Sequence, residues 1–206
     1  MLIETCNSKP NGNYGLLVGV EMGKLFSQIH SAMIKCGYIL ENIIEDLNLD
    51  SRMVFTTKIR VGTKSDGKPD NIKPDFFFDR SEDEDDDPVI VTFEKDNVID
   101  IQEWKLGTNF DTKKSAGEII SLLKLAEHFE KQGRKVRLGF MSYTAENKDV
   151  IRKGLKGKLP DEIIPITGRE LAEDLGFDYE SVLEQYKKDQ EANRNYIAKR
   201  VNEITR

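Results

Sequence analysis

The sequence predicts an α/β fold with a mixed β-sheet flanked by helices and a long helix at the C-terminal end. Three observations favour this class. Segments rich in β-branched and aromatic residues, the composition typical of strands, occur at 52–61, 73–78 and 98–105. Apolar residues recur at helical spacing between them and beyond. A helix-like segment separates strand 98–105 from strand 135–143, so we expect a crossover that makes these two strands parallel neighbours.

The N-terminal half alternates between helical and extended patterns. Leu16 to Cys36 carries apolar residues at helical spacing, and 38–47 repeats that pattern over a shorter stretch. Residues 52–61 are expected to form one strand. The turn-rich TKSDGKPDN at 63–71 is expected to be a loop, and 73–78 the next strand.

The C-terminal half begins with an expected hairpin of 89–95 with 98–105, turning at Asp96 and Asn97. Helix 115–132 follows. Its Ser115 and Glu118 have the spacing of a capping box, which accounts for Glu118 without a catalytic role.

Strand 135–143, helical turns near 145–154 and strand 162–166 come next, and a second capping box is expected at Thr167 and Glu170. The last helix spans about 178–206. The chain of 206 residues suits one domain, with a core of about 15–176 and a helical extension of about 177–206.

The net charge of −6 is distributed unevenly. Residues 79–87 hold seven acids and one arginine, so the rest of the chain is close to neutral. Residues 133–158, which include Arg134 and Arg137, hold eight lysines and arginines against two acids. This basic stretch fits either phosphate binding or a solvated face, and the acidic run fits either cation binding or a solvated loop.

Compartment signals are few. No apolar run approaches the 18 residues of a membrane span, and the first ten residues lack the layout of a signal peptide. Cys6 and Cys36 have no metal-ligand spacing and are expected to be reduced thiols. We therefore expect a cytoplasmic protein without membrane partners.

One combination of residues points to phosphodiester hydrolysis. Glu103 and Lys105 are two residues apart in a strand and therefore share a face, while Trp104 offers its backbone carbonyl between them. Asp75 would come from a neighbouring strand. Two acids are suitable ligands for Mg²⁺, and a lysine beside them can stabilise negative charge in the transition state.

Context selects these residues from similar short patterns. Only Pro74-Asp75 opens an apolar strand, and only 103–105 ends one. The interval from Asp75 to Glu103 requires the acidic loop and residues 89–95 to form an inserted arm. The alternative is that Glu103 and Lys105 make a surface ion pair on an edge strand.

The stretches KPDFFF, IDIQEWKLGTNFDTKKSAGEIISLLK and KVRLGFMSY resemble the PD-(D/E)xK nuclease superfamily, and most of all its type II restriction endonucleases. The segment ITGRELAEDLG at 166–176 is also similar. The resemblance covers about residues 70–176. It departs from the family pattern in the acidic insert and in the long spacing between Asp75 and Glu103.

This resemblance implies a restriction-endonuclease-like sheet core, Mg²⁺ dependence, double-stranded DNA as the substrate and a homodimer. It assigns catalysis to Asp75, Glu103 and Lys105. It further implies metal binding by Asp75, Glu103 and the Trp104 carbonyl. Glu21 resembles a first-helix glutamate that completes the metal site in such enzymes, with Glu41 and Glu45 as rivals.

DNA binding is expected at Lys113, Lys114, Arg134 and Arg137. For Lys113 and Lys114 the alternative is a solvated loop before a helix.

The function that follows is a site-specific DNA endonuclease, a type II restriction enzyme, that hydrolyses phosphodiester bonds with a metal-activated water. One alternative is another nuclease on the same core that acts in DNA repair, resolves junctions or cleaves RNA. A further alternative is a non-enzymatic nucleic-acid-binding module. In such a module Asp75 and Glu103 need not converge.

Overall fold

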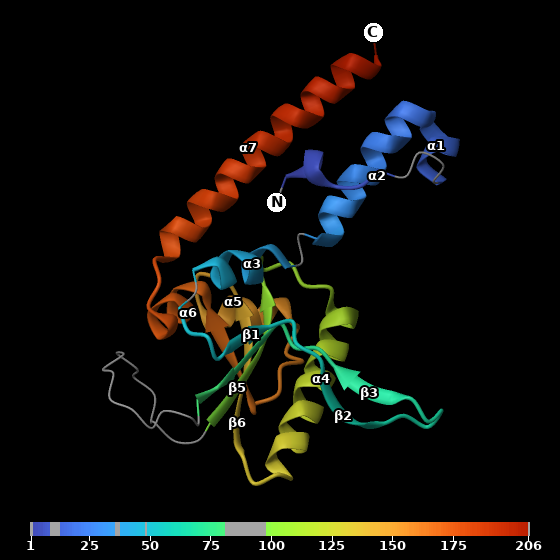
Figure 1. The fold of residues 1–206 in the computed structure, drawn as a ribbon. Coiled ribbons are helices and arrows are strands. Elements are labelled where there is room, and N and C mark those ends of the chain that lie inside the picture. The colour runs from blue at the N-terminus through green and yellow to red at the C-terminus, as the bar shows by residue number, and fades with distance from the viewer. Residues whose placement is uncertain (1, 9–12, 36–37, 48, 81–97, 206) are drawn as a thin grey trace. The chain divides into compact units, whose positions relative to one another are not determined.

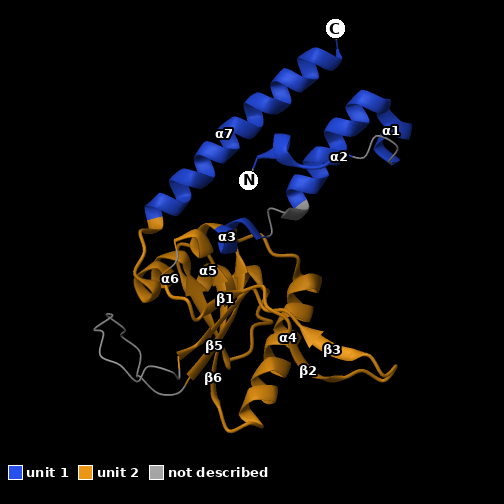
Figure 2. Cartoon of the chain, in the orientation of Figure 1, with its two compact units in different colours: residues 1–42, 180–206 blue, residues 43–179 orange. Residues whose placement is uncertain are grey.

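The computed structural model describes residues 2–8, 13–35, 38–47, 49–80 and 98–205. The chain forms two compact units (Figure 2). Unit 1 comprises residues 1–42 and 180–206, and unit 2 comprises residues 43–179. The single nuclease domain expected from the sequence stays a prediction.

Unit 2 is built on a five-stranded sheet in the order β1-β4-β5-β6-β7 (Figure 1). Its strands are β1 (Met53–Phe55), β4 (Phe76–Asp79), β5 (Val98–Lys105), β6 (Lys135–Ser142) and β7 (Ile163–Thr167). The strands β1, β4 and β5 pair antiparallel, whereas β5, β6 and β7 pair parallel. The predicted mixed sheet is therefore confirmed, and so is the parallel pairing of the strands at 98–105 and 135–143.

Helices cover both faces of this sheet. On one face, Ile119, Leu122 and Leu125 of α4 (Thr112–Glu130) pack with Ile99 and Ile101 of β5 in the main hydrophobic core. The helix α5 (Lys148–Gly154) adds Ile151 to the same core. On the other face, α6 (Gly168–Leu175) begins with the capping box that the sequence predicts at Thr167 and Glu170. The α/β fold class is confirmed.

The expected single strand 52–61 is wrong, because the chain turns at Thr56. This residue has φ 51°, which breaks the strand after β1, and its N–H donates to the carbonyl of Asp75 at 3.1 Å. The chain then forms β2 (Ile59–Thr63), which pairs with β3 (Pro69–Ile72). Four of the nine residues of the loop expected at 63–71 therefore belong to strands, namely Thr63 in β2 and Pro69, Asp70 and Asn71 in β3. The strand expected at 89–95 lies outside the described residues.

Unit 1 contains a short 3-10 helix η1 (Ile3–Thr5), followed by α1 (Asn13–Val18), α2 (Val20–Lys35) and the long helix α7 (Tyr179–Ile204). Gly19, at φ 80°, separates α1 from α2, so the single helix expected over 16–36 begins with a break. The N-terminal segment is joined to α7 by the Ile3 N–H, which donates to Asn193 Oδ1 at 2.7 Å. The helix α3 (Ile39–Asp46) spans the boundary between the units in the sequence.

Within the residues that the structure describes, no helix combines the length and apolar character needed to cross a lipid bilayer. Cys6 is a free, buried thiol.

Candidate active site

Two acidic side chains meet at the junction of β4 and β5. Phe76 faces Gln102 in the antiparallel register, so Asp75, one residue earlier, comes opposite Glu103. The Asp75 Oδ2 atom accepts a hydrogen bond of 2.9 Å from the backbone N–H of Trp104. The two acids that the sequence predicts to converge are therefore brought together from neighbouring strands.

Lys105 gathers these carboxylates around its ammonium group. Its Nζ atom lies 2.6 Å from Glu103 Oε1 and 3.9 Å from Asp75 Oδ2. Glu103 and Lys105 lie two residues apart on one face of β5, as the strand period requires. The side chains of Asp75 and Glu103 are largely buried, and that of Lys105 is only 23% exposed. A surface ion pair on an edge strand is excluded, since β5 is the central strand of the sheet.

Glu118 is a site residue that the sequence reasoning missed. The expected capping box of Ser115 with Glu118 is wrong, because α4 begins three residues earlier. Asp111 caps the helix instead, and its carboxylate accepts from the N–H groups of Lys113 and Lys114. Glu118 is therefore free to turn toward the sheet, where its Oε1 atom lies 3.1 Å from Lys105 Nζ.

The helical period of the sequence could have indicated that Glu118 faces the sheet. Positions 118, 122 and 125 fall on one stripe of α4, and Leu122 and Leu125 are fully buried. A glutamate in an otherwise apolar, sheet-facing stripe is unusual for a residue that serves only as a cap.

Burial and mutual repulsion perturb the site's acids. Burial, followed by the repulsion of Asp75, raises the pKa of Glu103 to about 9. Burial also raises the pKa of Asp75. For Lys105, burial lowers the pKa, but the attraction of Glu103 and the other acids outweighs this effect, and the pKa is raised overall. Three acids around one amine hold more negative charge than the amine can compensate.

The donor set fits Mg²⁺. Carboxylate oxygens are the ligands that this hard cation prefers, and it needs only one or two of them when a substrate phosphate supplies others. The Oε2 atom of Glu118 is buried and has no hydrogen-bond partner among the described residues. No group of three or more His, Cys, Asp or Glu side chains in the described part of the chain already forms a metal cage. Lys105 lies among the carboxylates instead, and a bound cation would take over part of its role in charge compensation.

The remaining predicted residues have varied surroundings. Lys113 and Lys114 belong to the exposed first turn of α4, and Lys114 Nζ approaches Glu118 Oε1 at 3.6 Å. Arg134 forms an ion pair of 2.5 Å with Asp79, and Arg137 lies 3.4 Å from both Asp100 and Asp174. These contacts give both arginines structural partners within unit 2, and DNA binding by any of the four residues stays a prediction.

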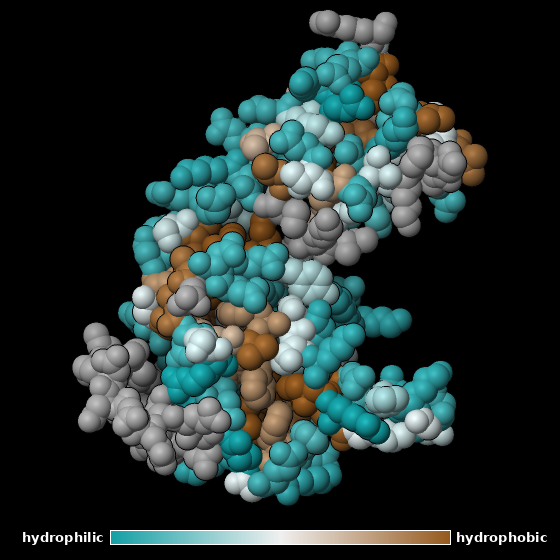
Figure 3. All heavy atoms as spheres, viewed as in Figure 1, coloured by the Kyte–Doolittle hydropathy of each residue, from teal (hydrophilic) through white to brown (hydrophobic). Residues whose placement is uncertain are grey.

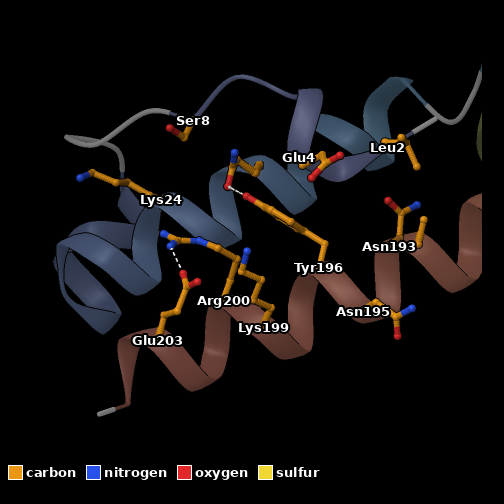
Figure 4. A pocket seen from close by; sticks show the side chains of 12 residues that line it. Leu2, Glu4, Ser8, Lys24, Asn193, Asn195, Tyr196, Lys199, Arg200 and Glu203 are labelled. Carbon is orange, nitrogen blue, oxygen red and sulfur yellow. Dashed lines mark hydrogen bonds and ion pairs between the residues drawn. The ribbon is translucent and has the colours of Figure 1, made fainter.

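Glu21 lies in unit 1, apart in the chain from the unit that holds Asp75, Glu103 and Lys105. It is half exposed, and its Oε1 atom is 2.6 Å from Lys24 Nζ. Lys24, its ion-pair partner, lines a pocket of about 590 Å³ between η1, α2 and α7. Figure 4 shows that the pocket wall is polar and includes the Tyr196–Gln28 and Arg200–Glu203 contacts. Metal binding by Glu21 stays a prediction.

The opposite face of β5 carries a buried polar chain. The Trp104 indole N–H donates to Gln102 Oε1 at 2.9 Å, and Gln102 Nε2 donates to both oxygens of Asp100 at 3.1 Å. The indole also stacks on Phe76, with ring centroids 5.0 Å apart. Gln102 therefore points away from Glu103, and its contacts hold the segment of β5 that carries Glu103 and Lys105.

A mixed sheet flanked by helices, with two acids and a lysine on its central strands, is consistent with the restriction-endonuclease-like fold. The chain is 30% identical over 200 residues to the type II restriction enzyme HhaII of Haemophilus parahaemolyticus, and the match covers 91% of this chain and 86% of that protein. The chain therefore belongs to the type II restriction enzyme family. No family model and no solved structure matches it.

Proposed function

We propose that this protein is a Mg²⁺-dependent, site-specific endonuclease that cleaves double-stranded DNA with a PD-(D/E)xK active site. The observation that carries this proposal is the convergence of Asp75, Glu103 and Lys105 on two neighbouring strands. Its relationship to a type II restriction enzyme supports DNA as the substrate. The sequence elements of the superfamily resemblance coincide with the strands and the helix that build the site.

In this proposal Asp75 and Glu103 hold the cation, with the carbonyl of Trp104 as a further ligand. Mg²⁺ would supply a water of lowered pKa and neutralise charge on the phosphate. Lys105 stabilises the negative charge that develops on the phosphate oxygens in the transition state. Its contacts with Glu103 and Glu118 fix the ammonium group before the substrate arrives, so little reorganisation is needed during reaction.

Plasmid cleavage tests the proposal. The parent protein should give discrete fragments with Mg²⁺ and none with EDTA. Lys105→Ala should cleave at least about 100-fold more slowly, because a transition-state stabiliser has been removed. Lys131→Ala is the matched control, since Lys131 is an exposed lysine at the end of α4, ion-paired with Glu127. Parent-like cutting by Lys105→Ala would refute the role of this residue, and smeared products would refute site specificity.

We further propose a homodimer, because two copies of one site can act on the two strands of a two-fold symmetric DNA sequence. The exposed apolar side chains Leu16, Leu17, Val20 and Met33 of α1 and α2 provide surface for such an association. The cytoplasmic location expected from the sequence stays a prediction.

A further inference from the structure

The strands β2 and β3 form a ribbon of their own, separate from the main sheet. In Figure 1 this ribbon projects from the rest of unit 2. Its turn is closed by the Gly67 N–H, which donates to Lys64 O at 2.9 Å, and by the Lys64 N–H, which donates to Lys68 O at 2.8 Å. Gly67 supplies the positive φ of 81° that this short turn requires.

One face of the ribbon anchors it to the core. Ile72 is buried in the main hydrophobic core, and Ile59 and Val61 pack against that core. Asp70 approaches Lys124 of α4 at 3.6 Å. The ribbon base is therefore fixed by apolar packing on one side, and the opposite face and the turn are left to the solvent.

The exposed side carries groups suited to DNA. Arg60 and Asn71 lie opposite each other in the register, on the face away from Ile59 and Ile72, and both are exposed. Lys64 and Lys68 are exposed at the turn. Among the described residues no acid forms an ion pair with Arg60 or Lys64, whereas Lys68 pairs with Asp66 at 3.1 Å. Figure 3 shows the projecting ribbon covered largely by hydrophilic side chains.

We infer that this ribbon binds duplex DNA, with Arg60 and Asn71 against base edges in the major groove and Lys64 and Lys68 on phosphates. A two-stranded β-ribbon fits the width of the major groove. Arginine and asparagine are the side chains that pair in bidentate fashion with guanine and adenine edges, and lysines contribute sequence-independent phosphate contacts. The ribbon ends at Ile72, three residues before Asp75, so the DNA-contacting element leads directly into the catalytic strand. This inference rests on the proposed function.

Binding measurements test the inference. Two duplexes are labelled, one containing the cleavage site mapped on plasmid and one of unrelated sequence, and Ca²⁺ replaces Mg²⁺ to hold cleavage back. Lys64→Ala and Lys68→Ala should weaken binding to both duplexes alike. Each should lower the slope of log affinity against log salt by about 1. Arg60→Ala and Asn71→Ala should each weaken binding to the site duplex by about 5- to 150-fold more than binding to the unrelated duplex. All four side chains are exposed, so thermal midpoints should stay at the parent value.

Lys131→Ala serves again as the control and should bind both duplexes as the parent does. If the parent cuts DNA at discrete sites while the four ribbon variants bind and cut as it does, the role of the ribbon is overturned and the proposed function stands. If the parent neither binds nor cuts duplex DNA, the proposed function itself is overturned, and the inference with it.

Discussion

Glu118 reaches the candidate active site from the second turn of α4 and contacts Lys105, although it belongs to neither of the strands that position Asp75 and Glu103. Its position would let it hold Lys105 if Glu103 bound a cation. Glu118 also adds negative charge to the site that we propose binds a divalent ion. A glutamine at this position would keep the shape of the side chain and remove the charge.

We expect Glu118→Gln to require about 10- to 100-fold more Mg²⁺ for half-maximal cleavage, the usual loss when a residue that supports a metal site is changed. The measurement is single-turnover cleavage across a Mg²⁺ titration. Glu127→Gln, an exposed glutamate on the same helix, is the control. An unchanged Mg²⁺ requirement in Glu118→Gln would show that Glu118 has no part in cation binding.

The raised pKa of Glu103 has a consequence for stability. In the absence of a bound cation, a pKa of about 9 favours the protonated form of this carboxyl in the folded state, whereas the ordinary pKa of glutamate is 4.5. Because the folded state binds more protons between these values, the free energy of unfolding falls as pH rises through this window. The raised pKa of Asp75 acts in the same direction.

In EDTA we therefore expect the thermal midpoint to decrease from pH 5 to pH 9. Glu103→Gln, which mimics the protonated acid, should flatten this profile and unfold at a higher temperature than the parent at pH 9. Equal slopes for the parent and the variant would contradict the assignment of the proton to Glu103.

Among the elements, β5 carries the candidate catalytic residues Glu103 and Lys105 on one face and a buried charge network on the other. Asp100 is fully buried and lies 3.4 Å from both Arg80 and Arg137. In Asp100→Ala, Asp174 is still an acid that both arginines contact. We expect a loss of about 3–5 kcal/mol in the free energy of unfolding, because a buried charge pair is broken by removing one partner.

Urea unfolding measures this loss. Asp79→Ala is the comparison, since the Asp79–Arg134 pair is about 30% exposed on both sides. Such pairs contribute roughly 0–1 kcal/mol. An Asp100→Ala loss no larger than that of Asp79→Ala would show that the network does not stabilise the strand.

The elements also show which features the sequence could predict. The strand at 98–105, the crossover helix and the strand at 135–143 follow from periodicity, and the face shared by Glu103 and Lys105 follows from the strand period. The break at Thr56 did not follow, because a positive φ at a threonine has no signature in the sequence. The capping box at Ser115 was wrong because Asp111, an equally good cap, competes for the same helix start. Glu118 was consequently assigned to the wrong partner.

The whole molecule consists of two compact units that carry different features. Unit 2 holds the candidate catalytic residues and the ribbon, and unit 1 holds the N-terminal helices and α7 with exposed apolar side chains. One chain has a mass of 23.6 kDa. If the protein is the dimer that we propose, light scattering during size-exclusion chromatography should give a mass of about twice that value. A mass of one chain at micromolar concentration would contradict the dimer.

We propose that Asp75 and Glu103 act together on one cation beside the scissile phosphate. Single-turnover cleavage of the mapped site by Asp75→Asn and Asp79→Asn, at saturating Mg²⁺, tests it most directly. Each substitution removes one negative charge. The two positions are four residues apart and lie on the same side of the strand. Of the two acids, only Asp75 lies beside Lys105. We predict at least about a 100-fold loss of rate for Asp75→Asn, with Asp79→Asn close to the parent. Equal rates for the two variants would contradict the claim.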